Sequence, residues 1–120
     1  MSAPNAAASP GLKIQRYHLY WVNPDPTRGS EIAKTRSALV VSPDAMNKRI
    51  ATVVICPLTS QLNPSLASRV QCECAGQPGE IAIDQIRTVS RQRLQKHIRK
   101  IDAETAAQVR EAIVWLYATA

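Results

Sequence analysis

Glu31 and Arg36 are the first residues whose types suggest chemistry, because both lie in one loop between two strand-like apolar runs, in the stretch WVNPDPTRGSEIAKTRSALVV at 21–41. A carboxylate can accept a proton, and a guanidinium can bind two anionic oxygens through its planar fork. A glutamate and an arginine at this spacing are more often an exposed ion pair, which stabilises a fold by about 0–1 kcal/mol. The residue types alone leave both interpretations open.

A concentration of basic residues later in the chain indicates a polyanionic partner. The chain has a formal net charge of +6 and a pI near 9.7. Within 84–101 the only acid is Asp84, whereas the basic residues are Arg87, Arg91, Arg93, Lys96, Arg99 and Lys100. Such clustering is typical of a surface that binds nucleic acid or an acidic protein segment, although a solvated basic face has the same composition.

The histidines and cysteines favour no metal, cofactor or disulfide chemistry. His18 and His97 are the only histidines and lie far apart in the sequence, which gives little support to an acid–base pair of histidines. The three cysteines are an odd number and include no CxxC pair, so neither a disulfide framework nor a structural zinc site is expected. A reducing cytoplasm is the expected location.

Length and composition predict one soluble domain. Of the 120 residues 45% are hydrophobic and 20% are charged, and no apolar run approaches the ~20 residues of a membrane helix. Residues 1–11 are rich in Ala, Ser and Pro and lack the features of a secretory signal, so we expect a disordered lead. Residues 12–120 would form the single domain, with no membrane partner.

Short apolar runs between turn-forming residues predict a sheet of about six strands. Branched and aromatic residues favour strands at 12–23, 37–42 and 50–56, and the segment 43–48 between the last two is a helical turn or a loop. Strict alternation at 68–74 places three apolar side chains on one face, namely Val70, Cys72 and Cys74.

The stretch EIAIDQIRTVSR at 80–91 follows a GQPG turn and is also strand-like. Its apolar spacing changes between Ile83 and Ile86, which predicts a bend or bulge near Asp84 and Gln85. A bend of this kind can direct a side chain towards a site, although an ordinary break in the strand is the simpler interpretation.

A C-terminal helix is predicted after Asp102, which is a suitable N-cap. Trp115 lies off its apolar stripe and hints at a subunit interface, whereas the stripe itself comprises Ala106, Val109, Ile113, Leu116 and Tyr117. Strands followed by one helix predict a mainly β fold with helices (α+β), built on a small, strongly bent antiparallel sheet or barrel.

Three motifs in this chain together resemble the MazF/PemK/Kid family of bacterial toxins. They are WVNPDPTRGSEIAKTRSALVVSP, then CPLTSQ at 56–61 and IDQIRTV at 83–89, and the resemblance extends to the C-terminal helix. It implies an SH3-like barrel of the PemK/CcdB type that assembles as a homodimer. It also implies the toxin of a type II toxin–antitoxin system, a sequence-selective endoribonuclease that cleaves single-stranded mRNA without a metal.

The same resemblance implies catalytic roles for Glu31, Arg36 and Thr59. Attack of a 2′-hydroxyl on the adjacent phosphate needs a base, a proton donor and stabilisation of negative charge. Glu31 would accept the proton, Arg36 would bind the phosphate, and Thr59 would donate a hydrogen bond to a nonbridging oxygen. The expected substrate-binding residues are Arg28, Ser60, Gln61, Asp84, Gln85 and Arg87.

Two positions depart from the family pattern. Ser37 follows Arg36 where a proline is usual, which loosens the backbone restraint on the arginine. Ala82 stands two residues before Asp84, where some Kid-like members have an arginine, so Glu31 with Arg36 is the favoured pair. These departures leave open a catalytically degenerate family member that keeps the barrel and antitoxin binding but has lost RNA cleavage.

The expected partners are single-stranded RNA, a cognate antitoxin with an acidic C-terminal segment, and a second copy of the chain. DNA would be contacted only indirectly, through the antitoxin. A non-enzymatic gyrase poison of the CcdB type is an alternative function, although this chain ends in YATA and lacks the terminal tryptophan motif of that group.

Overall fold

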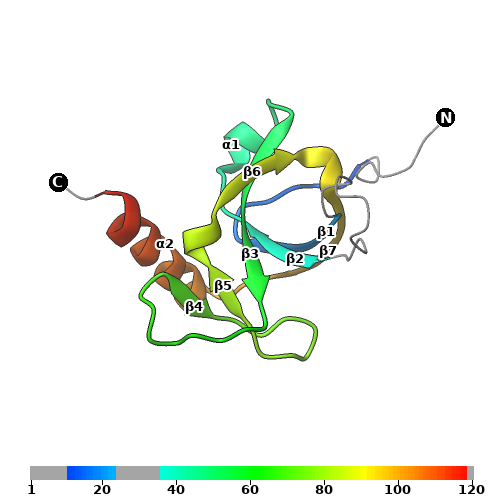
Figure 1. Cartoon of the computed structure of the whole chain (residues 1–120). Coiled ribbons are helices and arrows are strands. Elements are labelled where there is room, and N and C mark those ends of the chain that lie inside the picture. Colours follow the sequence, from blue (N-terminus) through cyan, green and yellow to red (C-terminus); the bar gives the residue numbers. More distant parts are fainter. Residues whose placement is uncertain (1–10, 24–35, 119–120) are drawn as a thin grey trace, which may run out of the picture.

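The structure, a computed structural model, describes residues 11–23 and 36–118. Its strands are β1 (His18–Val22), β2 (Arg36–Val40), β3 (Thr52–Thr59), β4 (Arg69–Gln71), β5 (Glu80–Ala82), β6 (Arg87–Ser90) and β7 (Leu94–Lys100). Its helices are α1 (Asp44–Asn47), η1 (Ile83–Gln85), η2 (Arg91–Arg93) and α2 (Ala103–Tyr117). The expected antiparallel sheet with a C-terminal helix is confirmed (Figure 1).

The sheet is strongly bent because its long central strand serves two partners in succession. The strand order is β4-β5-β3-β2-β1-β7, and β6 pairs with β3 beside this path. The first half of β3 pairs with β6, and its end pairs with β5. In Figure 1, β6 and β7 complete the bend that begins with β1, β2 and β3. Within the described ranges the pairing runs openly from β4 to β7 and does not close into a ring.

Alternate residues of the central strands face two different cores, which explains why runs such as SALVV are apolar throughout. Leu19 and Leu39 face a core that α2 completes with Val109. Tyr20 and Val40, their neighbours in sequence, face the inside of the bend. A sheet that is buried on both faces needs nearly continuous apolar residues, so simple alternation does not describe these strands.

Helix α2 begins as predicted. The carboxylate of Asp102 accepts a hydrogen bond from the Thr105 backbone N–H at 2.7 Å, which is an N-cap interaction. The helix packs on β4 and η1 and buries Ala106, Val109 and Ala112. Tyr117 is the last helical residue and is 55% exposed, so including it in the packed stripe was wrong. Trp115 is 58% exposed, as its place off the stripe predicts.

Two expectations about strand positions were wrong. The first strand starts at His18 and not at residue 12, because Tyr17 has a φ of +66°, a left-handed conformation that interrupts an extended chain. Strand β7 was not predicted, because only Leu94 within it is fully buried and basic residues dominate the rest. Basic side chains of this kind are common on edge strands, where they oppose pairing with other chains.

The other local expectations agree with the structure. The segment after Pro43 is the short helix α1, and the bend near Asp84 is η1. Val70, Cys72 and Cys74 are buried, although only residues 69–71 of this run are in a strand. None of the helices in the described part of the chain combines the length and the apolar character needed to cross a membrane.

Candidate active site

Arg36 and Thr59 lie on one face of the sheet, on neighbouring strands. The register of β2 and β3 pairs Ala38 with Pro57. Arg36 lies two residues before Ala38, and Thr59 lies two residues after Pro57. Residues two apart on a strand share a face, and opposite residues on paired strands share it too. The two side chains predicted to be catalytic therefore project to the same side.

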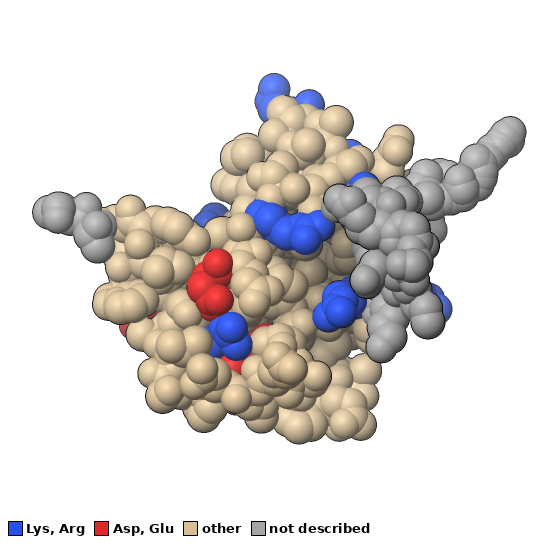
Figure 2. Space-filling model, in the orientation of Figure 1, with Lys and Arg blue, Asp and Glu red and all other residues tan. Residues whose placement is uncertain are grey.

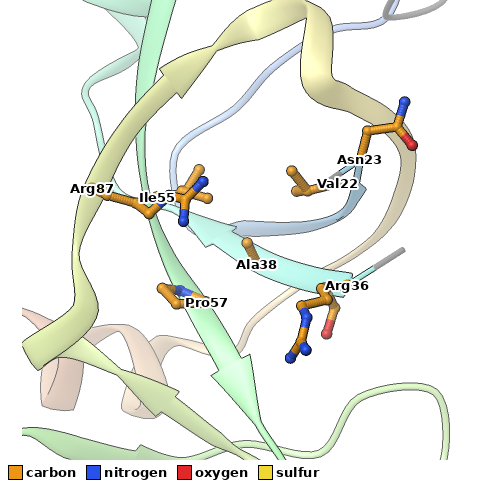
Figure 3. A pocket seen from close by; sticks show the side chains of 8 residues that line it. Val22, Asn23, Arg36, Ala38, Ile55, Pro57 and Arg87 are labelled. Carbon is orange, nitrogen blue, oxygen red and sulfur yellow. The ribbon is translucent and has the colours of Figure 1, made fainter. Parts of the chain in front are cut away.

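Arg87 joins this face from the opposite direction. It is the first residue of β6 and pairs with Ile55 on β3. Ile55 lies two residues before Pro57 and four before Thr59, so these three residues of β3 share one face. Arg36 and Arg87 are both exposed. Figure 3 shows them on opposite sides of the hollow that β2, β3 and β6 surround. Two guanidinium groups on facing walls form a site suited to a phosphodiester backbone.

Two adjoining hollows share Arg36 and Ser37. The first, of about 170 Å³, is the one in Figure 3, and it is lined by Val22, Asn23, Arg36, Ser37, Ala38, Ile55, Pro57 and Arg87. The second has a volume of about 280 Å³ and is lined by Trp21, Arg36, Ser37, Leu58, Thr59, Ser60, Cys74, Ala75, Gln77, Pro78 and Gly79. Arg36 thus stands where the two hollows meet.

Basic groups surround this region of the surface. In Figure 2, separate patches of Lys and Arg border the middle of the face in view, and an acidic patch lies over the position of η1 beside another basic group. With a net charge of +6 on the whole chain, this distribution favours an extended anion in the hollows.

The backbone of Arg36 is held by strand pairing. Arg36 pairs with Val22 across the β1–β2 ladder, and Ser37 pairs with Trp21. Arg36 therefore begins the strand in register with the end of β1. Ala82, the second departure from the family pattern, is fully buried in β5 and provides no charged group.

Thr59 is oriented by its own turn. Its Oγ1 accepts a hydrogen bond from the Gln61 backbone N–H at 3.0 Å, a local contact typical of a threonine at a turn. A hydroxyl that accepts one hydrogen bond keeps its proton to donate. Ser60, the next residue, lines the same hollow, whereas Gln61 lines neither hollow.

Asp84 and Gln85 also lie outside the lining of both hollows. The Asp84 carboxylate accepts hydrogen bonds from the Ser68 hydroxyl at 2.9 Å and from Arg69 Nε at 2.8 Å. The hydrogen bond from Arg69 is the main reason why the pKa of Asp84 is lowered. These contacts match the simpler interpretation, in which Asp84 fixes the bend at η1.

The predicted site is thus brought together in part. Arg36, Thr59, Ser60 and Arg87 converge on the two adjoining hollows. Two further predicted residues, Glu31 and Arg28, lie outside the described residues.

Trp21 and Gly79 also line the second hollow, and sequence reasoning missed both. A Cβ at Gly79 would lie 3.3 Å from the Cys72 carbonyl oxygen and 3.4 Å from that of Thr59. Glycine therefore allows the close approach of the chain to Thr59. The only signal in the sequence was the GQPG turn, which indicates a bend but not the strand that it faces.

The two histidines are close together, contrary to the inference from their separation in sequence. His18 Nδ1 and His97 Nε2 are 2.8 Å apart, because β1 and β7 are neighbouring strands. Burial, followed by the charge of His97, lowers the pKa of His18. Neither histidine lines either hollow.

The cysteines are buried free thiols. Burial raises the pKa of Cys56 to about 12, which suits a core residue and not a nucleophile. Within the described ranges, no three His, Cys, Asp or Glu side chains are grouped so as to hold a metal ion.

Comparison with known proteins identifies the family. A family model described as "PemK-like, MazF-like toxin of type II toxin-antitoxin system" matches residues 15–117. Endoribonuclease EndoA of Bacillus subtilis is 30% identical over 105 residues, which cover 83% of this chain and 90% of that protein. Endoribonuclease MazF9 of Mycobacterium tuberculosis is 29% identical over 114 residues, covering 83% and 92% respectively.

Solved structures agree with this match. A crystal structure of MazE-MazF from Deinococcus radiodurans superposes with a TM-score of 0.78 at 27% identity, covering 91% of this chain and 99% of that chain. The Mycobacterium tuberculosis toxin MazF-mt6 has a TM-score of 0.72 at 19% identity, and this likeness concerns the fold alone. Because the family model spans nearly all of the described residues, the chain belongs to the PemK-like, MazF-like toxins of type II toxin–antitoxin systems.

Proposed function

We propose that this toxin is a sequence-selective endoribonuclease that cleaves single-stranded RNA in the cytoplasm. The observation that carries the proposal is the placement of Arg36 and Thr59 on one hollow, with Arg87 on the facing wall of the adjoining hollow. The relatives named endoribonucleases, EndoA and MazF9, support the same assignment by sequence.

The proposed reaction uses groups of the chain, the substrate and solvent water. Glu31 accepts the proton of a ribose 2′-hydroxyl, whose oxygen then attacks the adjacent phosphorus. The bond from phosphorus to the 5′-oxygen breaks, and that oxygen takes a proton from solvent water and leaves as a 5′-hydroxyl. Glu31 then releases the proton that it accepted to solvent. The products are therefore a 2′,3′-cyclic phosphate and a 5′-hydroxyl end.

Arg36 and Thr59 stabilise the charge that grows on the nonbridging oxygens during this step. The guanidinium of Arg36 binds two oxygens in one plane, and the hydroxyl of Thr59 donates one further hydrogen bond. Arg87, Ser60, Gln61 and Arg28 hold the flanking nucleotides. Asp84 is assigned an indirect role, because its carboxylate is bound to Ser68 and Arg69.

A cognate antitoxin with an acidic C-terminal segment is the proposed inhibitor, and the toxin is proposed to act as a homodimer. The basic residues of β6, η2 and β7 offer an acidic segment the same charge complementarity that they offer RNA. The crystal structures of MazE-MazF from Deinococcus radiodurans support a protein partner for this fold at 27% identity.

The test is cleavage of a defined transcript in the presence of EDTA, followed by mapping of both ends. We expect cuts at a recurring short sequence, with cyclic phosphate and 5′-hydroxyl termini. A matched transcript with a 2′-deoxyribose at the cut position should stay intact. Absence of cleavage, or 3′-hydroxyl ends, would refute the proposal, and inhibition of gyrase supercoiling by the same preparation would favour the CcdB-like alternative.

A further inference from the structure

Glu80 is a carboxylate with no exposed surface, and it lies beside the proposed site. Its side chain is 0% exposed. On β5 it is the register partner of Thr59 on β3 and of Gln71 on β4. Burial of a charged carboxylate is unfavourable unless hydrogen bonds and charges compensate for lost water. An apolar residue at this position would avoid the cost of burying a charge. The contacts that the carboxylate makes therefore indicate its role.

The carboxylate is bound by donors from two separate segments. The backbone N–H of Asn63 donates to both oxygens, at 2.9 Å each. Gln71 Nε2 donates at 2.6 Å, and Arg69 forms an ion pair at 3.4 Å. Burial acts to raise the pKa of Glu80, but the hydrogen bonds from Asn63, Gln71 and Arg69 outweigh it and lower the pKa. Glu80 is therefore ionised at neutral pH.

The Asn63 contact fixes the chain that follows Thr59. Residues 60–63 leave the end of β3 and have no strand partner of their own. At one end of this segment, Thr59 Oγ1 accepts from the Gln61 N–H. At the other end, Glu80 accepts from Asn63. The segment is thus closed into a compact turn against β5, with Ser60 on the hollow.

We propose that Glu80 is a positioning residue, which holds the turn at 60–63 so that Ser60 and Gln61 meet the RNA beside Thr59. This inference rests on the proposed ribonuclease function. It adds to that function a residue, Glu80, that does not itself touch the substrate. Arg69 extends the arrangement, because it also binds Asp84 at 2.8 Å and so connects the turn to η1. Asp84 would act on the site only through Arg69.

The test compares Glu80→Met with Glu80→Gln. Methionine has a similar length but lacks the oxygens, so the Asn63 N–H loses its acceptor. Glutamine keeps one oxygen for Asn63, and Gln71 can turn its amide to accept from the new side chain. Because the turn carries binding contacts, we expect Glu80→Met to raise the KM for RNA about 10-fold, with kcat changed less than about threefold. Glu80→Gln should recover most of this loss.

Glu73→Gln is the matched control, since Glu73 is an exposed glutamate in the segment between β4 and β5. Amide hydrogen exchange gives a readout that does not require activity, and Glu80→Met should speed exchange across 60–66 while leaving β1 and β7 unchanged. Unaltered exchange in this turn, or an unchanged KM in an active enzyme, would overturn the inference. Absence of cleavage by the unmodified toxin would instead refute the ribonuclease proposal. The hydrogen-exchange result would then still decide whether Glu80 holds the turn at 60–63.

Discussion

Arg36 and Thr59 reach the same hollow from adjacent strands. In the β2–β3 ladder Arg36 lies two residues before Ala38, and Thr59 lies two residues after Pro57, the register partner of Ala38. Their relative placement therefore depends on strand register, which backbone hydrogen bonds and two cores hold. A slip of one residue would send one of the two side chains to the other face.

Thr59→Val tests the proposed hydrogen bond to the phosphate. Valine keeps the shape of threonine but removes the hydroxyl, and the exposed Gln61 N–H that it leaves can bind water. Loss of one donor to a developing charge lowers kcat by about 100-fold. Thr59→Ser should retain most activity because it keeps the donor. Single-turnover cleavage of a short RNA measures both, and equal rates for valine and threonine would remove Thr59 from the mechanism.

Arg87→Ala tests the facing wall of the first hollow. If Arg87 contacts a phosphate, the variant should bind RNA more weakly, and the slope of log K against log salt should become shallower by about 0.7, as expected for one lost contact on a single strand. Fluorescence anisotropy with an uncleavable 2′-deoxy substrate gives this slope. Arg49→Ala, at an exposed arginine before the start of β3, is the control. A slope that both variants share with the unmodified toxin would contradict the assignment.

His18 predicts how stability changes with pH. Its pKa is lowered in the folded state, mainly by burial and then by His97 and Lys100, with Lys13 adding to this and Asp44 opposing it. The unfolded chain therefore binds a proton first as the pH falls below about 6.5, and stability decreases from there through the folded pKa.

His18→Asn should reduce the fall in Tm between pH 7.5 and pH 5.5, because it removes a group whose pKa is lowered by folding. Thermal unfolding at a series of pH values checks this. Glu80, Asp84 and Asp102 also have lowered pKa values, but their contribution is lost only in a more acid range, below about pH 4.5. An identical Tm profile for His18→Asn above pH 5 would contradict the prediction.

The sequence was most informative where local chemistry decides the structure. The N-cap at Asp102 was predicted, and the segment after Pro43, which is helix α1, was narrowed to a helical turn or a loop. Both features depend on neighbouring residues. The family motifs located Arg36 and Thr59, but only the register shows that they share a hollow.

Other features depend on contacts between distant segments and were therefore missed. Strand β7 has few buried residues, so its pairing with β1 has no clear apolar signature. The contact between His18 and His97 follows from that pairing. Glu80 looks like an ordinary surface residue after a turn, and only its partners on β4 and in the turn at 60–63 explain why it is buried.

The central claim is that the Arg36 guanidinium binds the scissile phosphate, and substitution at this position tests it most directly. The measurement is kcat/KM for one defined RNA in EDTA, for Arg36→Ala and Arg36→Lys against the unmodified toxin, with circular dichroism to confirm the fold. We predict a loss of about 100- to 1000-fold for alanine and a smaller loss for lysine, which keeps the charge without the planar fork. A folded Arg36→Ala variant that cleaves the same RNA at the unmodified rate would contradict the account.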